Sequence, residues 1–229
     1  MCFHLLVKAH SNRLDFVPAY WESGAMKKNR IGILGGSFNP PHVGHLIIAQ
    51  NAYEEFGLSK VIFVPSKQPP HKAPRSVIDP SHRMAMTASA IAGDNRFELS
   101  DMELSMEGPS YTINTIRQLH LRYPDTELCF IIGADSLLEL HLWKDIVELL
   151  GLCRFVTFVR PGFGSNGIME SDVKLPAPWP NKLLSDVRPG LLVAVSSSEV
   201  RRRVAEGLSI KYLVPQAVEV YITSNELYK

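Results

Sequence analysis

Five short, nearly continuous apolar runs limit the folds that are open to this chain. They cover residues 31–34, 61–64, 128–132, 155–159 and 191–195. Runs of this kind are typical of strands that are covered on both faces, as in a parallel sheet. Segments with helical periodicity lie between them: one ends at Gly57, one opens at Asp79-Pro80, and one covers residues 111–123. The alternation predicts an α/β fold, a Rossmann-like doubly wound parallel sheet with helices on both faces and ligands at the carboxyl ends of its strands.

The domain organisation follows from the length and from two unusual segments. A chain of 229 residues is long enough for one ordinary α/β domain, which we place at residues 26–229. Residues 1–25 make a poor signal peptide, and Met26 directly precedes the first predicted strand, so we expect an N-terminal extension outside the functional fold. Residues 161–190 are rich in proline and glycine, which favours a long surface loop or insertion.

Charge and cysteine usage exclude several classes of function. The net charge is +1, so no broad basic field indicates a nucleic-acid or membrane partner. No apolar stretch approaches the roughly 20 residues that cross a bilayer. Cys129 lies within an apolar run, and the three cysteines lack metal-ligand spacing, which favours buried thiols and a cytoplasmic location. Any site for an anion must therefore be built locally from a few residues.

The clearest chemistry lies at residues 35–45, directly after the first predicted strand. Gly35 and Gly36 allow a tight turn and let a ligand approach the backbone amides. His42 and His45 are three residues apart at the start of the next predicted helix, so they share a face, and Gly44 leaves room for a phosphate. Free N–H groups at the helix start add donors and partial positive charge. The segment predicts a phosphate site, although a glycine turn after a strand is also a common structural device.

Two other kinds of site fit these residues less well. The segment matches neither the Walker pattern nor the Gly-x-Gly-x-x-Gly dinucleotide fingerprint. A zinc site would need a third ligand, and no His, Cys or carboxylate lies at suitable spacing from the two histidines. We therefore predict phosphate binding and no metal ligands from the protein.

A second cluster of candidate residues lies at positions 196–201. Ser198 is a plausible N-cap, which would put Arg201 at the third helical position. A cation there opposes the helix dipole at a cost of about 0.3–1 kcal/mol, and this position makes sense if Arg201 faces an anion. Arg202 and Arg203 have no comparable support, and we expect both on a solvated face.

Asp135 follows a predicted strand and so lies at the expected ligand edge of the sheet. Its carboxylate suits a ribose diol, which can donate two hydrogen bonds. The alternative is that Asp135 caps a helix that begins at Ser136. The two roles are compatible.

Together these segments resemble a known family. His42-Val43-Gly44-His45, after a Gly-Gly-Ser-Phe turn, resembles the signature of nucleotidyltransferases that share a His-x-Gly-His motif. Over residues 31–222 the chain resembles bacterial nicotinate-nucleotide adenylyltransferases. The further segments in the right order are 69–72, 110–112, 133–135, Trp143 with 160–162, and 196–201. Two departures are small: Ser198 stands where threonine is common, and Asn114 where an aspartate is often seen.

The resemblance implies adenylyl transfer from ATP to nicotinate mononucleotide, giving deamido-NAD and pyrophosphate in NAD biosynthesis. It implies catalytic roles for His42, His45 and Arg201, with Mg²⁺ carried by ATP. The implied ATP-binding residues are Gly35, Gly36, Ser37, Phe38, His42, Gly44, His45, Gly133, Asp135, Ser197, Ser198 and Arg201. The implied mononucleotide-binding residues are Lys72, Tyr111, Thr112, Trp143 and Arg160.

Several alternatives stay open at this point. The enzyme could prefer nicotinamide mononucleotide, because discrimination rests on backbone geometry, and Trp143 could be a plain core residue. A non-catalytic nucleotide sensor could keep the same fold, although loss of a histidine or of Arg201 would be expected in such a protein. Adenylyl transfer to phosphopantetheine is disfavoured, because such chains are usually shorter and lack segments 69–72 and 110–112 together. The oligomeric state is not predicted.

Overall fold

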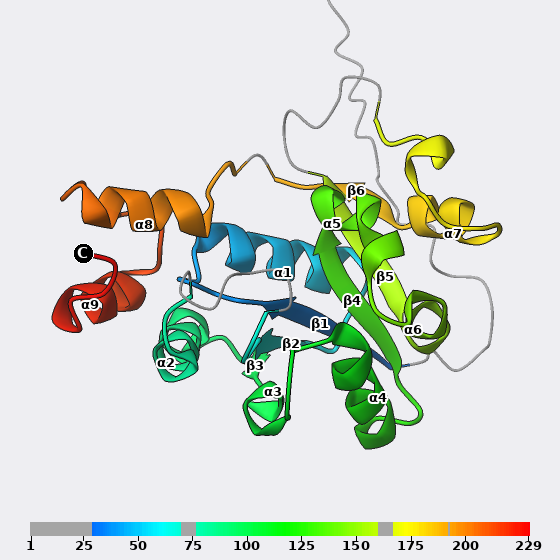
Figure 1. Cartoon of the computed structure of the whole chain (residues 1–229), viewed down its shortest axis with the longest axis horizontal. Helices are drawn as coiled ribbons and strands as arrows, with labels where there is room; N and C mark the ends of the chain where they lie inside the picture. The colour runs from blue at the N-terminus through cyan, green and yellow to red at the C-terminus, as the bar shows by residue number, and fades with distance from the viewer. Residues whose placement is uncertain (1–28, 70–76, 160–166, 192) are drawn as a thin grey trace, which may run out of the picture.

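The computed structural model describes residues 29–69, 77–159, 167–191 and 193–229. Within these residues one six-stranded sheet runs through the molecule in the order β3-β2-β1-β4-β5-β6 (Figure 1). All neighbouring strands are parallel. The strands are β1 (Arg30–Gly36), β2 (Lys60–Pro65), β3 (Phe97–Leu99), β4 (Glu127–Gly133), β5 (Arg154–Val159) and β6 (Val187–Pro189). The predicted Rossmann-like doubly wound sheet is confirmed.

Helices connect these strands. The longer ones among the described residues are α1 (Val43–Glu55), α2 (Pro80–Ile91), α4 (Thr112–Arg122), α8 (Ser197–Ala205) and α9 (Gln216–Ser224). The shorter ones are α3 (Met102–Ser105), α5 (Ala134–Leu138), α6 (Ile146–Leu152), α7 (Trp179–Ser185), and the 3₁₀ turns η2 (Leu140–Leu142) and η3 (Glu170–Asp172).

Both faces of the sheet are buried, and alternate residues of each strand serve the two faces. On β4, Phe130 and Ile132 join an apolar cluster with α4, α6 and α7, whereas Cys129 and Ile131 join a second cluster with α1 and Ile91 of α2. This period of two is the geometry of a strand. The continuous apolar runs therefore arise because both faces need apolar side chains.

The order of the strands determines where a ligand can bind. β1 pairs with β2 on one side and with β4 on the other, so the chain direction across the sheet reverses between β1 and β4. In open α/β sheets, ligands bind outside the carboxyl ends of the strands at such a reversal. The segments after β1 and after β4 are therefore the expected walls of a site.

Local signals in the sequence give three helix boundaries correctly, the start of α2 and the ends of α1 and α4. Asp79 caps α2, where its Oδ1 accepts a hydrogen bond from the Ser81 N–H at 2.8 Å. Gly57 lies just after the end of α1 with a φ of 59°, a left-handed conformation that glycine adopts without strain. Pro124 follows α4 as predicted.

Two predictions about the last third of the chain are wrong. Residues 191 and 193–195 form no strand in the described structure. Instead the sixth strand is Val187–Pro189, inside the region 161–190 that the composition assigned to a loop, and α7 lies there as well. Leu191 is 64% exposed. Together with Val193 and Val195 it lines a cavity at the carboxyl end of β5. The apolar side chains of Leu191, Val193 and Val195 therefore form part of a cavity wall and do not belong to the sheet.

A third apolar cluster joins α8 and α9 to α2, at one end of the molecule (Figure 1). It is built from Met86, Val200, Ile210, Val214, Val218 and Ile222, all buried. The cluster attaches α8, α9 and the segment between them to α2. This segment also lies close to the turn that follows β1, because the Val43 N–H donates to the Leu213 carbonyl at 3.0 Å.

A buried ion pair holds β6 to the sheet, and its loss should destabilise the fold. Arg154 on β5 donates two hydrogen bonds to the Asp186 carboxylate, at 2.7 and 2.5 Å, and the Asp186 side chain is 11% exposed. We expect Asp186→Ala to lower the free energy of unfolding by about 2 kcal/mol or more, because a half-buried guanidinium loses both short hydrogen bonds and keeps only the Glu127 carboxylate, 3.8 Å away. Chemical denaturation measures the change.

The matched control is Glu148→Ala, which removes a similar two-bond contact with Arg117 at the surface, where the Glu148 side chain is 47% exposed. We expect a loss below about 1 kcal/mol there. Equal losses in the two variants would show that burial does not set the strength of the Arg154–Asp186 contact.

Candidate active site

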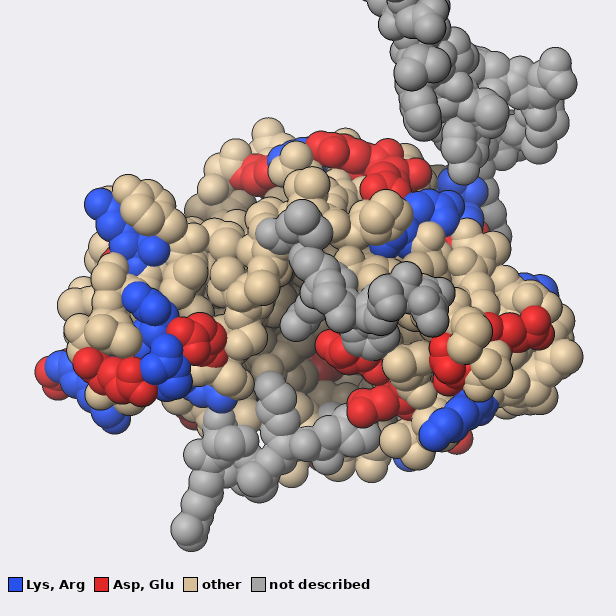
Figure 2. Space-filling model, turned by 90° about the horizontal axis from the view of Figure 1, so that it is seen from above, with Lys and Arg blue, Asp and Glu red and all other residues tan. Residues whose placement is uncertain are grey.

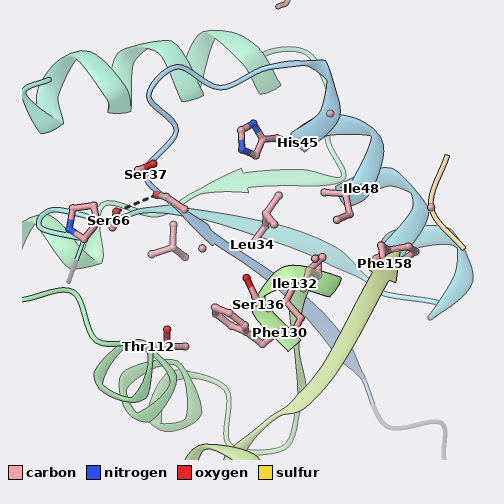
Figure 3. A pocket seen from close by; sticks show the side chains of 18 of the residues that line it. Leu34, Ser37, His45, Ile48, Ser66, Thr112, Phe130, Ile132, Ser136 and Phe158 are labelled. Carbon is pink, nitrogen blue, oxygen red and sulfur yellow. Dashed lines mark hydrogen bonds between the residues drawn. The ribbon is translucent and has the colours of Figure 1, made fainter. Parts of the chain in front are cut away.

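A cavity of about 750 Å³ opens at the carboxyl ends of β1 and β4, where the strand order reverses. Its size is in the range of small-molecule sites. Figure 3 shows His45 and Ser37 on one side of it, Thr112 on the opposite side, and Phe130, Ile132 and Phe158 from the strands. The walls are the turn after β1 with the start of α1, the start of α4, the end of β4, and the segment after β6.

His42 and His45 lie side by side on the first of these walls. Their ring centroids are 3.7 Å apart, His42 is 5% exposed, and both residues line the cavity. The His42 backbone N–H donates to Nδ1 of His45 at 3.1 Å. A neutral His45 therefore carries its proton on Nε2, which is the tautomer that can donate to a phosphate oxygen. The predicted placement of both histidines on one face is confirmed.

Gly44 lines the cavity, as its predicted role beside a phosphate requires, and it also gives space to the neighbouring histidine. A Cβ at position 44 would lie 3.0 Å from Nδ1 of His42. The missing side chain therefore makes room for the His42 ring itself.

Gly35, Gly36 and Ser37 line the cavity, but the Phe38 side chain does not. Phe38 is buried and packs edge-on against the His45 ring, with centroids 5.0 Å apart. It therefore supports one of the histidines from behind. Any contact of Phe38 with a ligand would involve its backbone.

Arg201 and its neighbours lie behind the turn that follows β1. Its Nη1 donates to the Asn39 carbonyl at 2.8 Å, and Ser197 Oγ donates to the Pro40 carbonyl at 2.8 Å. Arg201, Ser197 and Ser198 are not among the residues that line the cavity, although Val195, just before them, is. The start of α8 thus buttresses the histidine wall from outside.

The predicted N-cap of α8 is wrong. Ser196 is the cap, and its Oγ accepts a hydrogen bond from the Glu199 N–H at 3.1 Å. Arg201 is therefore the fifth residue of the helix, beyond the turn where the dipole acts strongly, so the expected dipole penalty does not explain its position. Arg202 is exposed as predicted and pairs with Glu199 and Glu206, whereas Arg203 is half-buried and donates to the Ser209 carbonyl.

The opposite wall is the N-terminus of α4. Tyr111 is the N-cap and Thr112 the first helical residue, and both line the cavity. Trp143 also lines it, while its ring packs nearly at right angles to Phe130 at 5.9 Å between centroids. The position of Trp143 is therefore compatible with both of its predicted roles, contact with a ligand and packing in the core. Lys144 brings a positive charge, with Nζ 4.6 Å from the centre of the Tyr111 ring.

Gly133 and Asp135 follow β4 as predicted, but only Gly133 lines the cavity. Asp135 is exposed and lies in the first turn of α5, whose N-cap is Gly133, so the prediction of an Asp135 cap is wrong. Ser136 lines the cavity in its place. Lys72 and Arg160 lie outside the described residues.

Glu103 is a site residue that the sequence did not reveal. It lies on α3, is 6% exposed, lines the cavity, and accepts a hydrogen bond from Thr115 Oγ1 at 2.5 Å. Burial raises the pKa of its carboxyl, an effect that hydrogen bonds from Thr115 and Ser110 partly oppose. A glutamate in a polar stretch resembles a surface residue, and only the packing of α4 over α3 buries it.

Arg83 on α2 is a second buried charge without a signal in the sequence. It is fully buried, and its guanidinium donates to backbone carbonyls of Ser37 at 2.8 Å, Ser66 at 2.6 Å and Lys67 at 3.2 Å. Ser37 follows β1, and Ser66 and Lys67 follow β2. Arg83 therefore ties two ligand-edge loops together and replaces the water that these carbonyls would otherwise bind.

The described surface carries charged side chains of both signs (Figure 2). Basic and acidic side chains are interspersed on the face in Figure 2, without one continuous basic patch. Among the described residues no group of three or more His, Cys, Asp and Glu side chains is placed to hold a metal ion. None of the helices in this part of the chain is long and apolar enough to span a membrane.

The buried Glu103 predicts how stability depends on pH. Its folded pKa lies above the unfolded value, so its contribution is complete below about pH 4.5 and is lost as the pH rises through the folded pKa. We therefore expect Glu103→Gln to gain stability relative to the wild type as the pH rises above 4.5, by about 1 kcal/mol for each pH unit in that window. Urea denaturation at a series of pH values measures it.

Glu107→Gln, at an exposed position four residues further on, is the matched control and should follow the wild type at every pH. A Glu103→Gln difference that stays constant between pH 4.5 and pH 8 would contradict the expectation.

Comparison with known proteins places the chain in a family. The cytidylyltransferase-like family model matches residues 33–203, more than half of the chain. A probable nicotinate-nucleotide adenylyltransferase of Desulfitobacterium hafniense (strain Y51) is 44% identical over 202 residues, which are 87% of this chain and 96% of the relative. Another protein of that name, from Thermoanaerobacter sp. (strain X514), is 46% identical over 201 residues, 87% and 94% of the two chains.

Solved structures agree in fold. The Plasmodium falciparum nicotinic acid mononucleotide adenylyltransferase complexed with NaAD superposes with a TM-score of 0.70 at 20% identity, over 87% of this chain and 97% of that one. The resemblance seen in the sequence is thus confirmed by relatives that match nearly along their whole length. The chain belongs to the nicotinate-nucleotide adenylyltransferase family, a branch of the cytidylyltransferase-like nucleotidyltransferases.

Proposed function

We propose that the cavity carries out the reaction of this family, adenylyl transfer from ATP to nicotinate mononucleotide, and that the residues around it divide the two substrates between its walls. The observation that carries the proposal is the placement of His42 and His45 across one cavity from the N-terminus of α4. The histidine wall suits the phosphates of ATP, and the α4 wall suits a pyridine carboxylate.

The reaction is a direct displacement at the α-phosphorus of ATP. An oxygen of the mononucleotide 5′-phosphate forms the new P–O bond, and the bond to the bridging oxygen of pyrophosphate breaks. The attacking oxygen is already ionised at pH 7, so neither a protein nucleophile nor a base is needed. Catalysis then rests on positioning and on stabilising the negative charge of the transition state.

The histidine wall can supply that stabilisation. Because Nδ1 of His45 accepts from the His42 N–H, a neutral His45 carries its proton on Nε2, and this N–H can donate to a phosphate oxygen. The partial positive charge at the N-terminus of α1 adds to this stabilisation, and the backbone of Gly35, Gly36 and Ser37 lies beside it along the cavity. Phe38, Gly44, Gly133, Asp135, Ser197 and Ser198 complete the proposed ATP site.

Arg201 takes part from the rim. Its Nη1 holds the Asn39 carbonyl at 2.8 Å, whereas Nη2 makes only a 3.3 Å contact with Ser198 Oγ. The second of these is the weaker, and a phosphate oxygen of ATP would replace it. In this proposal Arg201 holds the turn and neutralises phosphate charge with the same guanidinium.

The α4 wall favours nicotinate over nicotinamide. The N-terminus of α4, which begins at Thr112, carries partial positive charge that suits a carboxylate better than a neutral amide. Glu103 also lines the cavity, and burial raises the pKa of its carboxyl, so its negative charge is less favourable there than in water. The ring of Trp143 can lie against the pyridinium. Lys72 and Arg160 remain proposed contacts to the mononucleotide.

Mg²⁺ enters this proposal with the nucleotide. The described residues offer no cluster of carboxylates or imidazoles for a resident ion. ATP binds Mg²⁺ through its own phosphate oxygens, and the ion then lowers the charge that the histidine wall has to stabilise. We also propose a cytoplasmic location, which the buried free thiols of Cys129 and Cys153 support.

Replacement of a histidine tests the assignment of the phosphate wall. We expect His45→Ala to lower kcat by about 100-fold or more, because a donor to the transition-state charge is lost, with little change in KM for the mononucleotide. The matched control is His120→Ala, at an exposed position in the last turn of α4. A His45→Ala enzyme with near-normal kcat would refute the assignment.

The direct test of the activity is pyrophosphate release from ATP and Mg²⁺ with each mononucleotide supplied separately. We expect faster release with nicotinate mononucleotide than with nicotinamide mononucleotide, because of the α4 amides. No release with either would favour the non-catalytic nucleotide sensor. Faster release with the amide would overturn the specificity and leave the reaction class intact.

A further inference from the structure

The segment that follows α9 turns back toward the phosphate wall. Glu226 and Tyr228 have φ values of 53° and 65°, a left-handed conformation that residues other than glycine adopt only with strain. The Leu227 N–H donates to the Ile222 carbonyl at 3.1 Å, and Leu227 packs on the cluster that joins α8, α9 and α2. The chain end lies between α8 and α9 (Figure 1). Two strained residues are thus held in place by packing, and Tyr228 is oriented as a result.

The Tyr228 hydroxyl reaches the turn between β1 and α1. It donates to Oδ1 of Asn39 at 2.9 Å, and Asn39 is 1% exposed. Burial raises the pKa of Tyr228, an effect that the charges of Arg201 and Arg83 only partly oppose, so the hydroxyl keeps its proton at neutral pH. Tyr228 is therefore a constant donor to a buried amide, close to two guanidinium groups.

Asn39 connects Tyr228 to Arg201. Its side chain accepts from Tyr228, and its backbone carbonyl accepts from Nη1 of Arg201 at 2.8 Å. The residue thus receives one hydrogen bond from each of two C-terminal segments. A change in the orientation of the Asn39 side chain would shift the carbonyl that anchors Arg201.

We propose that Tyr228 is a positioning residue for adenylyl transfer, which fixes Asn39 so that Arg201 is held at the angle needed to meet the phosphates of ATP. This inference rests on the proposed function, in which Arg201 contacts ATP and not the mononucleotide. Loss of the Tyr228 hydroxyl should therefore weaken the interaction with ATP selectively. A tyrosine that merely packs the end of the chain would affect only stability.

The experiment compares Tyr228→Phe with Tyr221→Phe. Tyr221 lies on α9 and packs on the same apolar cluster, but its hydroxyl bonds Nδ1 of His82 at 3.0 Å, away from the cavity. Each variant loses one hydroxyl and one hydrogen bond. We expect Tyr228→Phe to lower kcat/KM for ATP by about 3- to 10-fold with KM for the mononucleotide unchanged, and Tyr221→Phe to stay within about twofold of the wild type.

A second measurement asks whether Tyr228 acts through Arg201. In an Arg201→Lys background, Tyr228→Phe should add less than about a twofold loss, because the group that it positions has already been changed. Losses that multiply, or equal losses in the two tyrosine variants, would overturn the proposal. So would a lower Tm for Tyr228→Phe with unchanged kinetics.

Calorimetric titration of each variant with ATP and Mg²⁺ separates this proposal from the function on which it rests. If the wild type released no pyrophosphate, the proposed reaction would fail. The titration would still decide the role of Tyr228: weaker ATP binding in Tyr228→Phe but not in Tyr221→Phe supports it, and equal binding in both refutes it.

Discussion

Burial of β1 and β4 on both faces is the constraint on which the rest of the structure depends. Their backbone groups are paired within the sheet, and their side chains fill apolar clusters on either side. Helices must then cover both faces, which leaves the ends of the strands as the place where polar groups can gather. The reversal of strand order between β1 and β4 opens a gap between the connections at this edge, and the cavity lies in it.

The turn between β1 and α1 needs support that its own sequence does not provide. Its backbone carbonyls point away from the cavity and are bound by distant residues: Arg83 from α2 at Ser37, Arg201 from α8 at Asn39, and Ser197 at Pro40. A buried carbonyl without a partner is costly, so each of these contacts stabilises one conformation of the turn. The His42 and His45 side chains that this turn carries line the cavity.

The two walls of the cavity differ in the charged groups that they carry. The histidine wall carries imidazoles and a helix N-terminus, backed by two guanidinium groups that do not line the cavity. The α4 wall carries another helix N-terminus beside the buried Glu103, and burial raises the pKa of this carboxyl. The helix N-termini of both walls favour anionic groups of a ligand, and the apolar wall between them, which includes Phe130 and Trp143, is suited to flat rings.

Several parts of the fold and of the site were determined by the sequence alone, because they depend on neighbours along the chain. The positions of β1, β2, β4 and β5 follow from apolar runs, the start of α2 from Asp79-Pro80, and the pairing of His42 with His45 from their three-residue spacing on a helix. The tertiary structure decided what depends on contacts between distant segments. The burial of Glu103 and Arg83, the position of Arg201 behind the turn, and the use of Leu191, Val193 and Val195 as a cavity wall are of this kind. A side chain's burial is set by whichever element packs over it, and no local pattern encodes which element that is.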